Sequence, residues 1–140
     1  MDRLRILVVD DELGIRLAVK RTLQDYAIRL PDFEGEMSFE VDLVETGEEA
    51  LERIETLRPD ILLLDHKLPS MSGLDVLNRL SEKEVDMITV MITAYASLET
   101  AVTATKRGAF DFLAKPFTPE ELKAAVYKSA KHLMLGRRAR

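Results

Sequence analysis

The fold is indicated first by Ile61-Leu62-Leu63-Leu64-Asp65, four apolar residues that end in an acid. A run this short and this apolar is typical of a strand that is buried on both faces. Residues 66–73 contain Pro69, two serines and a final glycine, so they predict a loop. We therefore expect Asp65 to lie at the carboxyl end of a buried strand.

Three more strand-like runs each lead into polar side chains. They are residues 6–9 before Asp10 and Asp11, residues 88–92 before Thr93, and residues 110–114 before Lys115. In open parallel sheets, ligands bind outside the carboxyl ends of the strands. We therefore expect these carboxylates, the hydroxyl and the amine to form a cation and phosphate site at one edge of a sheet.

Strand-like and helix-like segments alternate along the whole chain. Strands are expected to begin near residues 4, 39, 60, 87 and 110, and apolar residues at helical spacing follow each of them. The helix starts are marked by capping residues, namely Thr46 with Glu49, Ser72, Ser97, and Thr118 with Pro119 and Glu121. Near-continuous apolar strands favour a parallel sheet covered on both faces, so the predicted class is α/β with five strand–helix units.

The interval between the first two expected strands is longer than the others. About 35 residues separate the first two strand starts, whereas the later intervals are about 21 to 27 residues long. The excess falls at residues 28–38, where Pro31 and Gly35 predict a loop. The aromatic residues Tyr26, Phe33 and Phe39 indicate that this loop packs against the protein. Two interpretations stay open, a tolerated surface insertion, which we favour, and a partner site.

The chain of 140 residues is long enough for one compact domain, which we place at residues 1–140. It contains no cysteine, so disulfides and thiolate metal sites are excluded. No apolar run approaches the roughly 20 residues that cross a bilayer, and the first residues lack a signal-peptide pattern. The expectation is a cytoplasmic protein without membrane contact.

The net charge of −5 is unevenly distributed. Residues 122–140 contain six Lys or Arg and no acid, which leaves −11 on the first 121 residues. An acidic body disfavours direct nucleic-acid binding through phosphate contacts. For the basic end we favour a solvated helix terminus over contact with an acidic partner. Residues 134–140 are interpreted as a basic tail or the start of a linker towards a further domain.

Asp10, Asp11 and Asp65 would place three carboxylates in one crevice. Because like charges repel, at least one of their pKa values should be raised, and a hard divalent cation would relieve the repulsion. Oxygen ligands favour Mg²⁺. Zinc and copper are disfavoured because there is no cysteine and the only histidines are His66 and His132. The predicted cofactor is Mg²⁺.

A carboxylate beside Mg²⁺ can also attack phosphorus and form an aspartyl phosphate. Such a transfer needs positive charge and hydrogen-bond donors around the phosphoryl oxygens, and Lys115 and Thr93 are suitable. Asp10 and Asp11 alone could cap a helix. Thr93 alone could be an ordinary strand end, and Lys115 with Pro116 an ordinary turn. Their joint placement, each after its own strand, favours the functional interpretation.

The ordered set of motifs resembles the receiver domain of two-component response regulators. The matching motifs are Val8-Val9-Asp10-Asp11-Glu12, Leu64-Asp65 with Leu68-Pro69-Ser70-Met71-Ser72-Gly73, Ile92-Thr93-Ala94, and Gly108-Ala109-Phe110-Asp111-Phe112-Leu113-Ala114-Lys115-Pro116-Phe117. The resemblance extends over residues 4–133, and Gly73-Leu74-Asp75-Val76-Leu77 is similar to regulators of the nitrogen-regulation type. It implies a flavodoxin-like, doubly wound sheet of five parallel strands in the order 2-1-3-4-5.

The resemblance implies a role for each acid. Asp65 would accept a phosphoryl group from a sensor histidine kinase or a phosphotransfer protein. Asp11, Asp65 and the Lys67 backbone carbonyl would bind Mg²⁺, and Asp10 would hold a metal-bound water. The protein would be a signalling switch rather than an enzyme, since it would catalyse only its own phosphorylation and dephosphorylation.

The resemblance also implies how the switch works. Lys115 would pair with Asp65 and then with the phosphoryl group, aimed by a cis peptide bond before Pro116. Thr93 would move towards the phosphoryl group, and Phe112 would turn inward. The surface of the fourth helix, fifth strand and fifth helix would then change, which would promote homodimerisation or binding of an output domain.

Three positions limit this comparison. Phe112 lacks the hydroxyl of the tyrosine often found there, so its movement cannot use a phenolic hydrogen bond. Lys67 and Tyr95 lie two residues after Asp65 and Thr93, where side chains tune the access of water in the family. We hypothesise that this long cation and this aromatic ring shield the phosphoryl group.

A sequence feature disfavours each competing function. A Mg²⁺-dependent phosphatase with a nucleophilic aspartate would carry an acid where this chain has Lys67. A flavin carrier would need a loop rich in Ser, Thr and Gly where Asp10-Asp11-Glu12-Leu13-Gly14 stands. A phosphorylation-independent interaction module would tolerate loss of the acidic set, which is complete here. This last class stays as the alternative.

Overall fold

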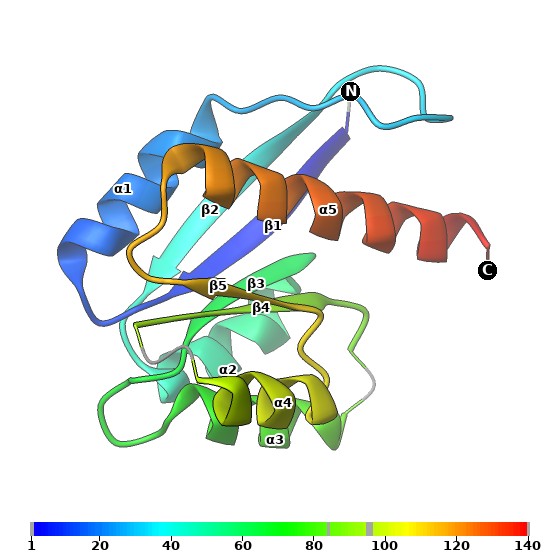
Figure 1. Cartoon of the computed structure of the whole chain (residues 1–140). Helices are drawn as coiled ribbons and strands as arrows, with labels where there is room; N and C mark the ends of the chain where they lie inside the picture. Colours follow the sequence, from blue (N-terminus) through cyan, green and yellow to red (C-terminus); the bar gives the residue numbers. More distant parts are fainter. Residues whose placement is uncertain (1, 84, 95–96, 140) are drawn as a thin grey trace.

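The computed structural model describes residues 2–83, 85–94 and 97–139 and places five strands in one parallel sheet (Figure 1). The elements are β1 (Asp2–Val9), α1 (Leu13–Gln24), β2 (Met37–Val44), α2 (Gly47–Leu57), β3 (Ile61–Asp65), α3 (Gly73–Ser81), β4 (Ile88–Thr93), α4 (Leu98–Lys106), β5 (Asp111–Ala114) and α5 (Pro119–Arg138). The strand order is β2-β1-β3-β4-β5. The predicted α/β class and strand order are thereby confirmed, and each strand begins within two residues of its expected start.

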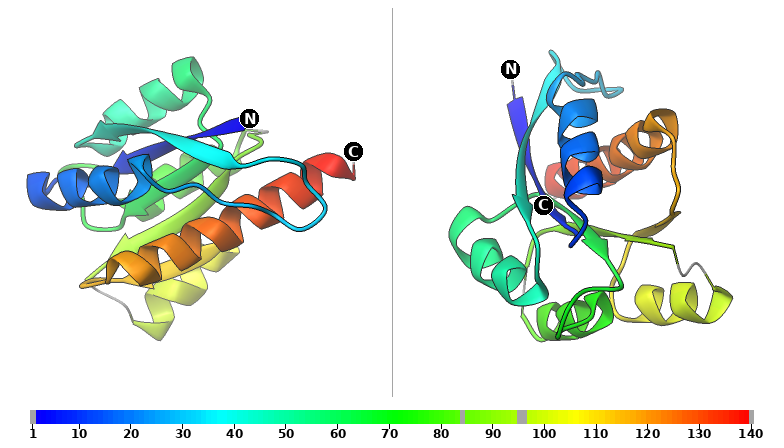
Figure 2. Two further views of the ribbon diagram at one scale, coloured as in Figure 1. Left: turned by 90° about the horizontal axis from the view of Figure 1, so that it is seen from above. Right: turned by 90° about the vertical axis from the view of Figure 1, so that its left-hand side faces the viewer.

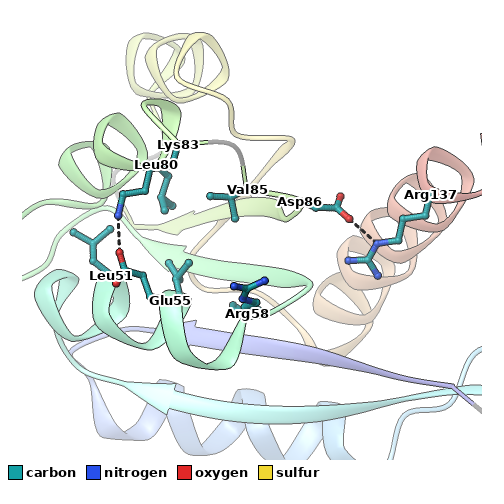
Figure 3. A pocket seen from close by; sticks show the side chains of 10 residues that line it. Leu51, Glu55, Arg58, Leu80, Lys83, Val85, Asp86 and Arg137 are labelled. Carbon is teal, nitrogen blue, oxygen red and sulfur yellow. Dashed lines mark hydrogen bonds and ion pairs between the residues drawn. The ribbon is translucent and has the colours of Figure 1, made fainter. Parts of the chain in front are cut away.

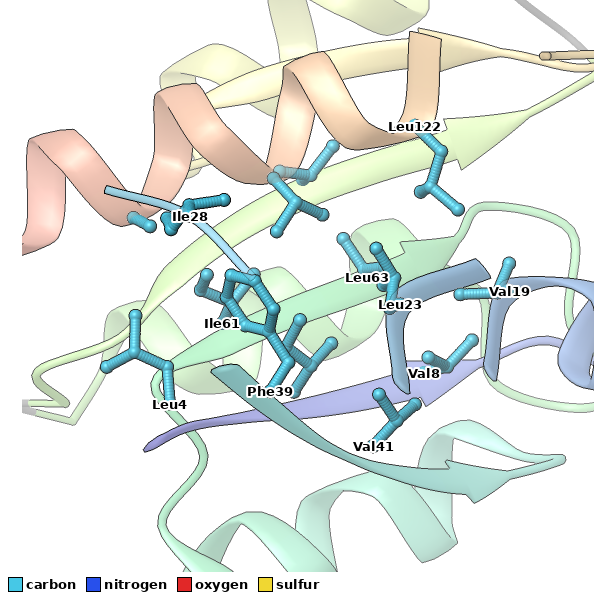
Figure 4. Close-up of a cluster of buried hydrophobic side chains, with 14 of the residues drawn as sticks. Leu4, Val8, Val19, Leu23, Ile28, Phe39, Val41, Ile61, Leu63 and Leu122 are labelled. Carbon is cyan, nitrogen blue, oxygen red and sulfur yellow. The ribbon is translucent and has the colours of Figure 1, made fainter. Parts of the chain in front are cut away.

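Helices cover both faces of the sheet. α1 and α5 lie on one face, and α2, α3 and α4 lie on the other (Figure 2). In β3, Ile61 and Leu63 join the layer under α1 and α5 (Figure 4), whereas Leu62 and Leu64 join the opposite layer. All four are fully buried, and burial of each side chain contributes about 1.5–3 kcal/mol. This two-sided burial explains why the strand is apolar at every position before Asp65.

Four helices begin at the polar residues that the sequence marks. Ser72 and Thr118 form complete capping boxes at α3 and α5, and the Ser97 hydroxyl caps α4. Thr46 caps α2 by accepting the backbone N–H of Glu49, which is one half of the predicted capping box. Each cap contributes about 1 kcal/mol, so local signals fix where these helices start relative to the strands.

The atypical segment before β2 packs against the protein, as its aromatic residues indicated. Ile28 forms an antiparallel bridge with Met37 through backbone hydrogen bonds of 2.9 and 2.8 Å. Arg138 of α5 lies over the Phe33 ring and donates a hydrogen bond to the Asp32 carbonyl. The expected loop at residues 28–38 is too long by two residues, because residues 37 and 38 pair with β1 and belong to β2.

The basic C-terminal residues up to Arg138 belong to a helix and do not form a free tail. α5 continues to that residue, and Arg137 forms ion pairs of 2.7 Å with Asp60 and 3.0 Å with Asp86. The interpretation as a solvated helix end is therefore wrong for Arg137, because acids before β3 and β4 pair with it. A cavity of about 710 Å³ borders this contact (Figure 3). None of the described helices, α5 included, is long and apolar enough to cross a membrane.

Candidate functional site

The carboxyl ends of β1, β3, β4 and β5 meet around a pocket of about 260 Å³, which we call the acidic pocket. It is lined by Asp11, Glu12, Asp65, Lys67, Thr93, Ala94 and Lys115. Asp10 lies beside it, within ion-pairing distance of Lys115. The fold thus brings together polar side chains that follow four separate strands in the sequence.

Asp65 ends β3 and is only 3% exposed. The start of α3 approaches it closely, and a Cβ at Gly73 would collide with the Asp65 carbonyl oxygen, so glycine is required there. Burial and the neighbouring Asp10 charge raise the pKa of Asp65 to about 6, although Lys115 opposes the rise. The expectation that one carboxylate of this crevice has a raised pKa is confirmed.

Asp10 is fully buried at the end of β1. Its Oδ1 accepts the backbone N–H of Glu12 at 2.9 Å, and its Oδ2 lies 2.7 Å from Lys115 Nζ. The second contact is a close ion pair with the Lys115 ammonium group. The N-cap residue of α1 is Glu12, and its side chain makes no capping bond. The alternative interpretation of Asp10 and Asp11 as a helix cap is therefore not supported.

Lys115 is a cation shared by several acids. Its Nζ lies 2.7 Å from Asp10 Oδ2 and 3.3 Å from both Asp65 Oδ2 and Glu12 Oε1. The peptide bond that joins Lys115 to Pro116 is cis. Burial would lower the pKa of Lys115, but the three carboxylates outweigh burial and raise it. The ammonium group therefore stays charged within the pocket.

Thr93 and Phe112 lie on adjacent strands. Thr93 ends β4, is fully buried, and accepts the backbone N–H of Lys115 at its carbonyl oxygen at 2.9 Å. Phe112 of β5 pairs with Met91 and packs, half-buried, into the layer under α2, α3 and α4. Tyr95, which we expected to shield the site, lies outside the described residues. A displacement of Thr93 would act directly on the strand that carries Phe112.

The loop that follows Asp65 is tied to α2. The Ser70 hydroxyl donates a hydrogen bond of 2.6 Å to Glu48 Oε2, and this bond holds the pKa of Glu48 below its usual value. Ser70 adopts a left-handed backbone conformation with φ of 60°. Lys67 is exposed, and its backbone N–H lies 3.4 Å from Asp65 Oδ1. The backbone of Lys67 is therefore held beside the Asp65 carboxylate.

The acids of the pocket fit a hard divalent cation. Carboxylate oxygens of Asp10, Asp11 and Glu12 lie within 4.8 Å of one another. The buried Asp10 Oδ2 contacts the Lys115 ammonium group, and because a carboxylate oxygen can accept from more than one partner, it has capacity for another ligand or donor. An oxygen-only set without sulfur or imidazole is the kind that Mg²⁺ prefers. The residues present therefore fit the predicted cofactor.

Two residues of this region were not among the predicted site residues. Glu12 reaches Lys115, which is 103 positions away in the sequence. Its place directly after Asp11 was the available signal, but an exposed acid before a helix is common. Arg16 donates a hydrogen bond to the Asp10 carbonyl oxygen at 2.8 Å. Nothing in the sequence pattern near the start of this helix indicated that Arg16 would be buried.

A family model described as the response regulator receiver domain matches residues 6–127. The chain belongs to this family. Receiver domains of response regulators act in phosphorylation-based two-component signalling, as switches rather than classical enzymes, and they bind Mg²⁺ at an acidic pocket. The acidic pocket of this receiver lies at the edge of the sheet where its sequence motifs converge.

Two curated relatives are longer proteins. Regulatory protein LuxO of Vibrio cholerae is 42% identical over 90 residues, which are 64% of this chain and 20% of that protein. The DNA-binding transcriptional regulator NtrC of Escherichia coli K12 is 33% identical over 132 residues, which are 94% of this chain and 26% of that protein. This receiver therefore spans about a quarter or less of the length of these two relatives.

Solved structures show the same architecture. The signal receiver domain of a putative LuxO repressor protein from Vibrio parahaemolyticus matches with a TM-score of 0.87 at 31% identity, covering 98% of this chain and 97% of that chain. NtrX from Brucella abortus matches with a TM-score of 0.82 at 32% identity, covering 98% of this chain and 29% of that chain. The predicted similarity to receivers of the nitrogen-regulation type is confirmed.

Proposed function

We propose that Asp65 accepts a phosphoryl group from a phosphohistidine on a sensor histidine kinase or a phosphotransfer protein. The main support is its position, buried at the end of β3 yet lining an open pocket, with Lys115 Nζ 3.3 Å away. Thr93 lines the same pocket. A lysine and a hydroxyl beside a carboxylate are suited to a group that brings three negatively polarised oxygens.

The proposed transfer is a substitution at phosphorus. An oxygen of ionised Asp65 forms a bond to phosphorus while the bond from phosphorus to the donor imidazole nitrogen breaks. The imidazole keeps the electron pair of that bond and then takes a proton. A pKa of about 6 leaves Asp65 mostly ionised at neutral pH, so the nucleophile is available. The product is an acyl phosphate within reach of Lys115 and Thr93.

The proposed Mg²⁺ ligands are Asp11, Asp65 and the Lys67 backbone carbonyl, with Asp10 holding a metal-bound water. When bound, the ion would neutralise charge on the transferred phosphoryl group. The closeness of the Asp10 and Asp11 carboxylates at the end of β1 supports their part in this assignment, and Asp65 and Lys67 line the same pocket as Asp11. Glu12, which contacts Lys115 and not Asp65, would keep the lysine in the pocket before the phosphoryl group arrives.

The proposed output is a change on the face formed by α4, β5 and α5. The new phosphoryl group would draw Lys115 and Thr93 towards it, and Phe112 would turn into the space that Thr93 leaves. On α4, Leu98 and Val102 are 82% and 43% exposed. Exposed apolar side chains of this kind mark interaction surfaces. Homodimerisation or contact with an output domain would bury them.

We propose that residues 1–140 form one receiver domain, with residues 134–140 leading towards a further domain. The greater length of the LuxO and NtrC relatives supports such a domain. The proposal keeps the cytoplasmic location expected from the sequence. It assigns no nucleic-acid binding to the receiver itself, because the body of the chain is acidic.

Intact-protein mass after incubation with acetyl phosphate tests the proposal. We expect one phosphoryl adduct that requires Mg²⁺ and that is absent from the Asp65→Asn variant. Removal of Mg²⁺ with a chelator should abolish the adduct in the unmodified sequence. A full-level adduct on Asp65→Asn would contradict the assignment of the phosphoacceptor. Absence of any adduct from the folded, Mg²⁺-binding protein would instead favour a phosphorylation-independent interaction module.

A further inference from the structure

Arg16 is a buried cation that the proposed chemistry does not use. It lies on α1 and is 8% exposed. Among the charged residues that the structure describes as buried, the other two are Asp10 and Asp65, which both belong to the site. Removing a guanidinium group from water is costly unless its hydrogen bonds are satisfied. The partners of Arg16 therefore indicate what its burial achieves.

Those partners lie at the ends of β1 and β2. Arg16 Nη1 donates to the Asp10 carbonyl oxygen at 2.8 Å, and Nη2 lies 3.5 Å from Glu45 Oε1. The Asp10 N–H donates to the Val44 carbonyl oxygen at 3.2 Å. The backbone of Asp10 is thus held from both sides, by β2 at its nitrogen and by Arg16 at its oxygen.

This contact bears on Asp11 through the peptide plane. The Asp10 carbonyl belongs to the planar unit that continues into the Asp11 nitrogen and Cα, so holding its oxygen fixes the orientation of that unit. The Asp10 side chain has further contacts to Glu12 and Lys115. The exposed Asp11 side chain has no hydrogen-bond or ion-pair partner among the described residues. Its position therefore depends on the backbone that Arg16 holds.

We infer that Arg16 is a positioning residue that orients the Asp10–Asp11 peptide unit, so that both carboxylates converge on one divalent cation. This inference rests on the proposed function, because the cation is needed for phosphorylation of Asp65. An arginine suits the role because its planar fork can bind two partners at once, which a lysine cannot do in the same geometry. The rival interpretation is a structural tie between α1 and the strand ends, which would affect stability alone.

The test compares three variants with the unmodified sequence. Arg16→Met keeps an apolar stem and removes all donors, whereas Arg16→Lys keeps the charge and loses the fork. Arg21→Met is the matched control, since Arg21 is exposed on the same helix. The Mg²⁺ dissociation constant is measured by calorimetry, and the initial rate of phosphorylation by acetyl phosphate is measured across Mg²⁺ concentrations. Thermal unfolding without Mg²⁺ reports stability separately.

We expect Arg16→Met to weaken Mg²⁺ binding about tenfold or more, as loss of groups that orient metal ligands does elsewhere. Arg16→Lys should give a smaller loss of about threefold, because it retains one donor group. Phosphorylation should be slow at low Mg²⁺ and recover towards the unmodified rate at saturating Mg²⁺. Arg21→Met should match the unmodified protein in both measurements.

A folded Arg16→Met protein with an unchanged Mg²⁺ dissociation constant would overturn the inference and leave Arg16 as a structural tie. If Arg16→Met does not fold, Arg16→Lys decides by the same criterion. Failure of the proposed function looks different. In that case the unmodified protein and Arg21→Met would also gain no phosphoryl group at any Mg²⁺ concentration.

Discussion

Two charge clusters lie at opposite ends of the parallel strands, one at the carboxyl ends and one at the amino ends, and they are built differently. In the acidic pocket one lysine, Lys115, contacts three carboxylates, and Asp11 lies beside them. At the amino ends of the strands Arg137 bridges Asp60 and Asp86, in a cluster that we call the Arg137 clamp. The pocket therefore holds an excess of negative charge, whereas the clamp is closer to balance.

The two clusters also differ in their access to water. The Lys115 side chain is 9% exposed, and that of Arg137 is 31% exposed. Water can screen the clamp, and the backbone N–H of Arg5 gives Asp60 a further hydrogen bond. In the pocket, burial itself and then repulsion by the Asp10 charge raise the pKa of Asp65. The fold thus places its larger charge imbalance where a cation can bind, whereas the smaller imbalance at Arg137 lies where the ion pairs join α5 to the residues before β3 and β4.

Replacing Lys115 with Met should have the largest effect on stability. The change leaves buried carboxylates without their cation, and loss of one partner from a buried ion pair costs about 3 kcal/mol. We expect the free energy of unfolding to fall by about that amount at neutral pH without Mg²⁺. Urea unfolding measures it. A loss that Mg²⁺ does not reduce would contradict the view that excess charge causes it.

The Asp65→Asn variant should be more stable than the unmodified protein at neutral pH without Mg²⁺. The pKa of Asp65 rises from 3.8 to about 6 on folding, so its ionised form opposes the folded state by about 1–3 kcal/mol above pH 6. This penalty develops between about pH 4 and pH 6 as pH rises, and it is absent below that window. The free energy of unfolding, measured across pH, should be higher for the variant than for the unmodified protein only above this pH window. An equal advantage at pH 3 would indicate another cause.

Binding of Mg²⁺ should stabilise the protein through the acidic pocket. At ten times its dissociation constant, a ligand adds about 1.4 kcal/mol to the free energy of unfolding. If Asp11→Asn weakens binding about tenfold, the same concentration adds only about 0.4 kcal/mol. Thermal shifts with and without Mg²⁺ measure the difference. Equal shifts for the two proteins would place the bound ion elsewhere.

Replacing Arg137 with Met should have the smallest effect. Its ion pairs are partly exposed, and such pairs contribute about 1 kcal/mol or less. We expect a small loss of stability with no change in Mg²⁺ affinity or phosphorylation by acetyl phosphate. Calorimetry and intact-protein mass on the variant check both. A large drop in Mg²⁺ affinity would show that the Arg137 clamp and the acidic pocket are energetically coupled.

The sequence predicted most of the fold because its signals are local. The apolar run before Asp65 and the caps at Ser72 and Thr118 each act within a few residues, and the structure places them as expected. The acidic pocket was predictable for a related reason. A parallel sheet brings the ends of its strands to one edge, so residues that follow separate strands must meet.

The remaining contacts depend on which distant segments meet. Arg137 and Asp60 are 77 positions apart, and no local pattern indicates that a helix end will reach the start of β3. Glu12 was missed for the same reason, since its partner Lys115 is 103 positions away. Arg16 contacts Asp10, which is near in the sequence, but the sequence does not show that its side chain folds back onto the end of β1. Side-chain roles of this kind follow from packing rather than from spacing.

The charge excess of the acidic pocket is tested most directly by the titration of Asp65 itself. Carbon-13 NMR of its side-chain carboxyl group, with and without Mg²⁺, gives the pKa in both states. We expect a pKa of about 6 without the ion, and a clearly lower value with Mg²⁺ bound, because a nearby cation favours the ionised form. A pKa close to 3.8 without the ion would contradict this account, because burial and the Asp10 charge would then not disfavour the ionised form of Asp65.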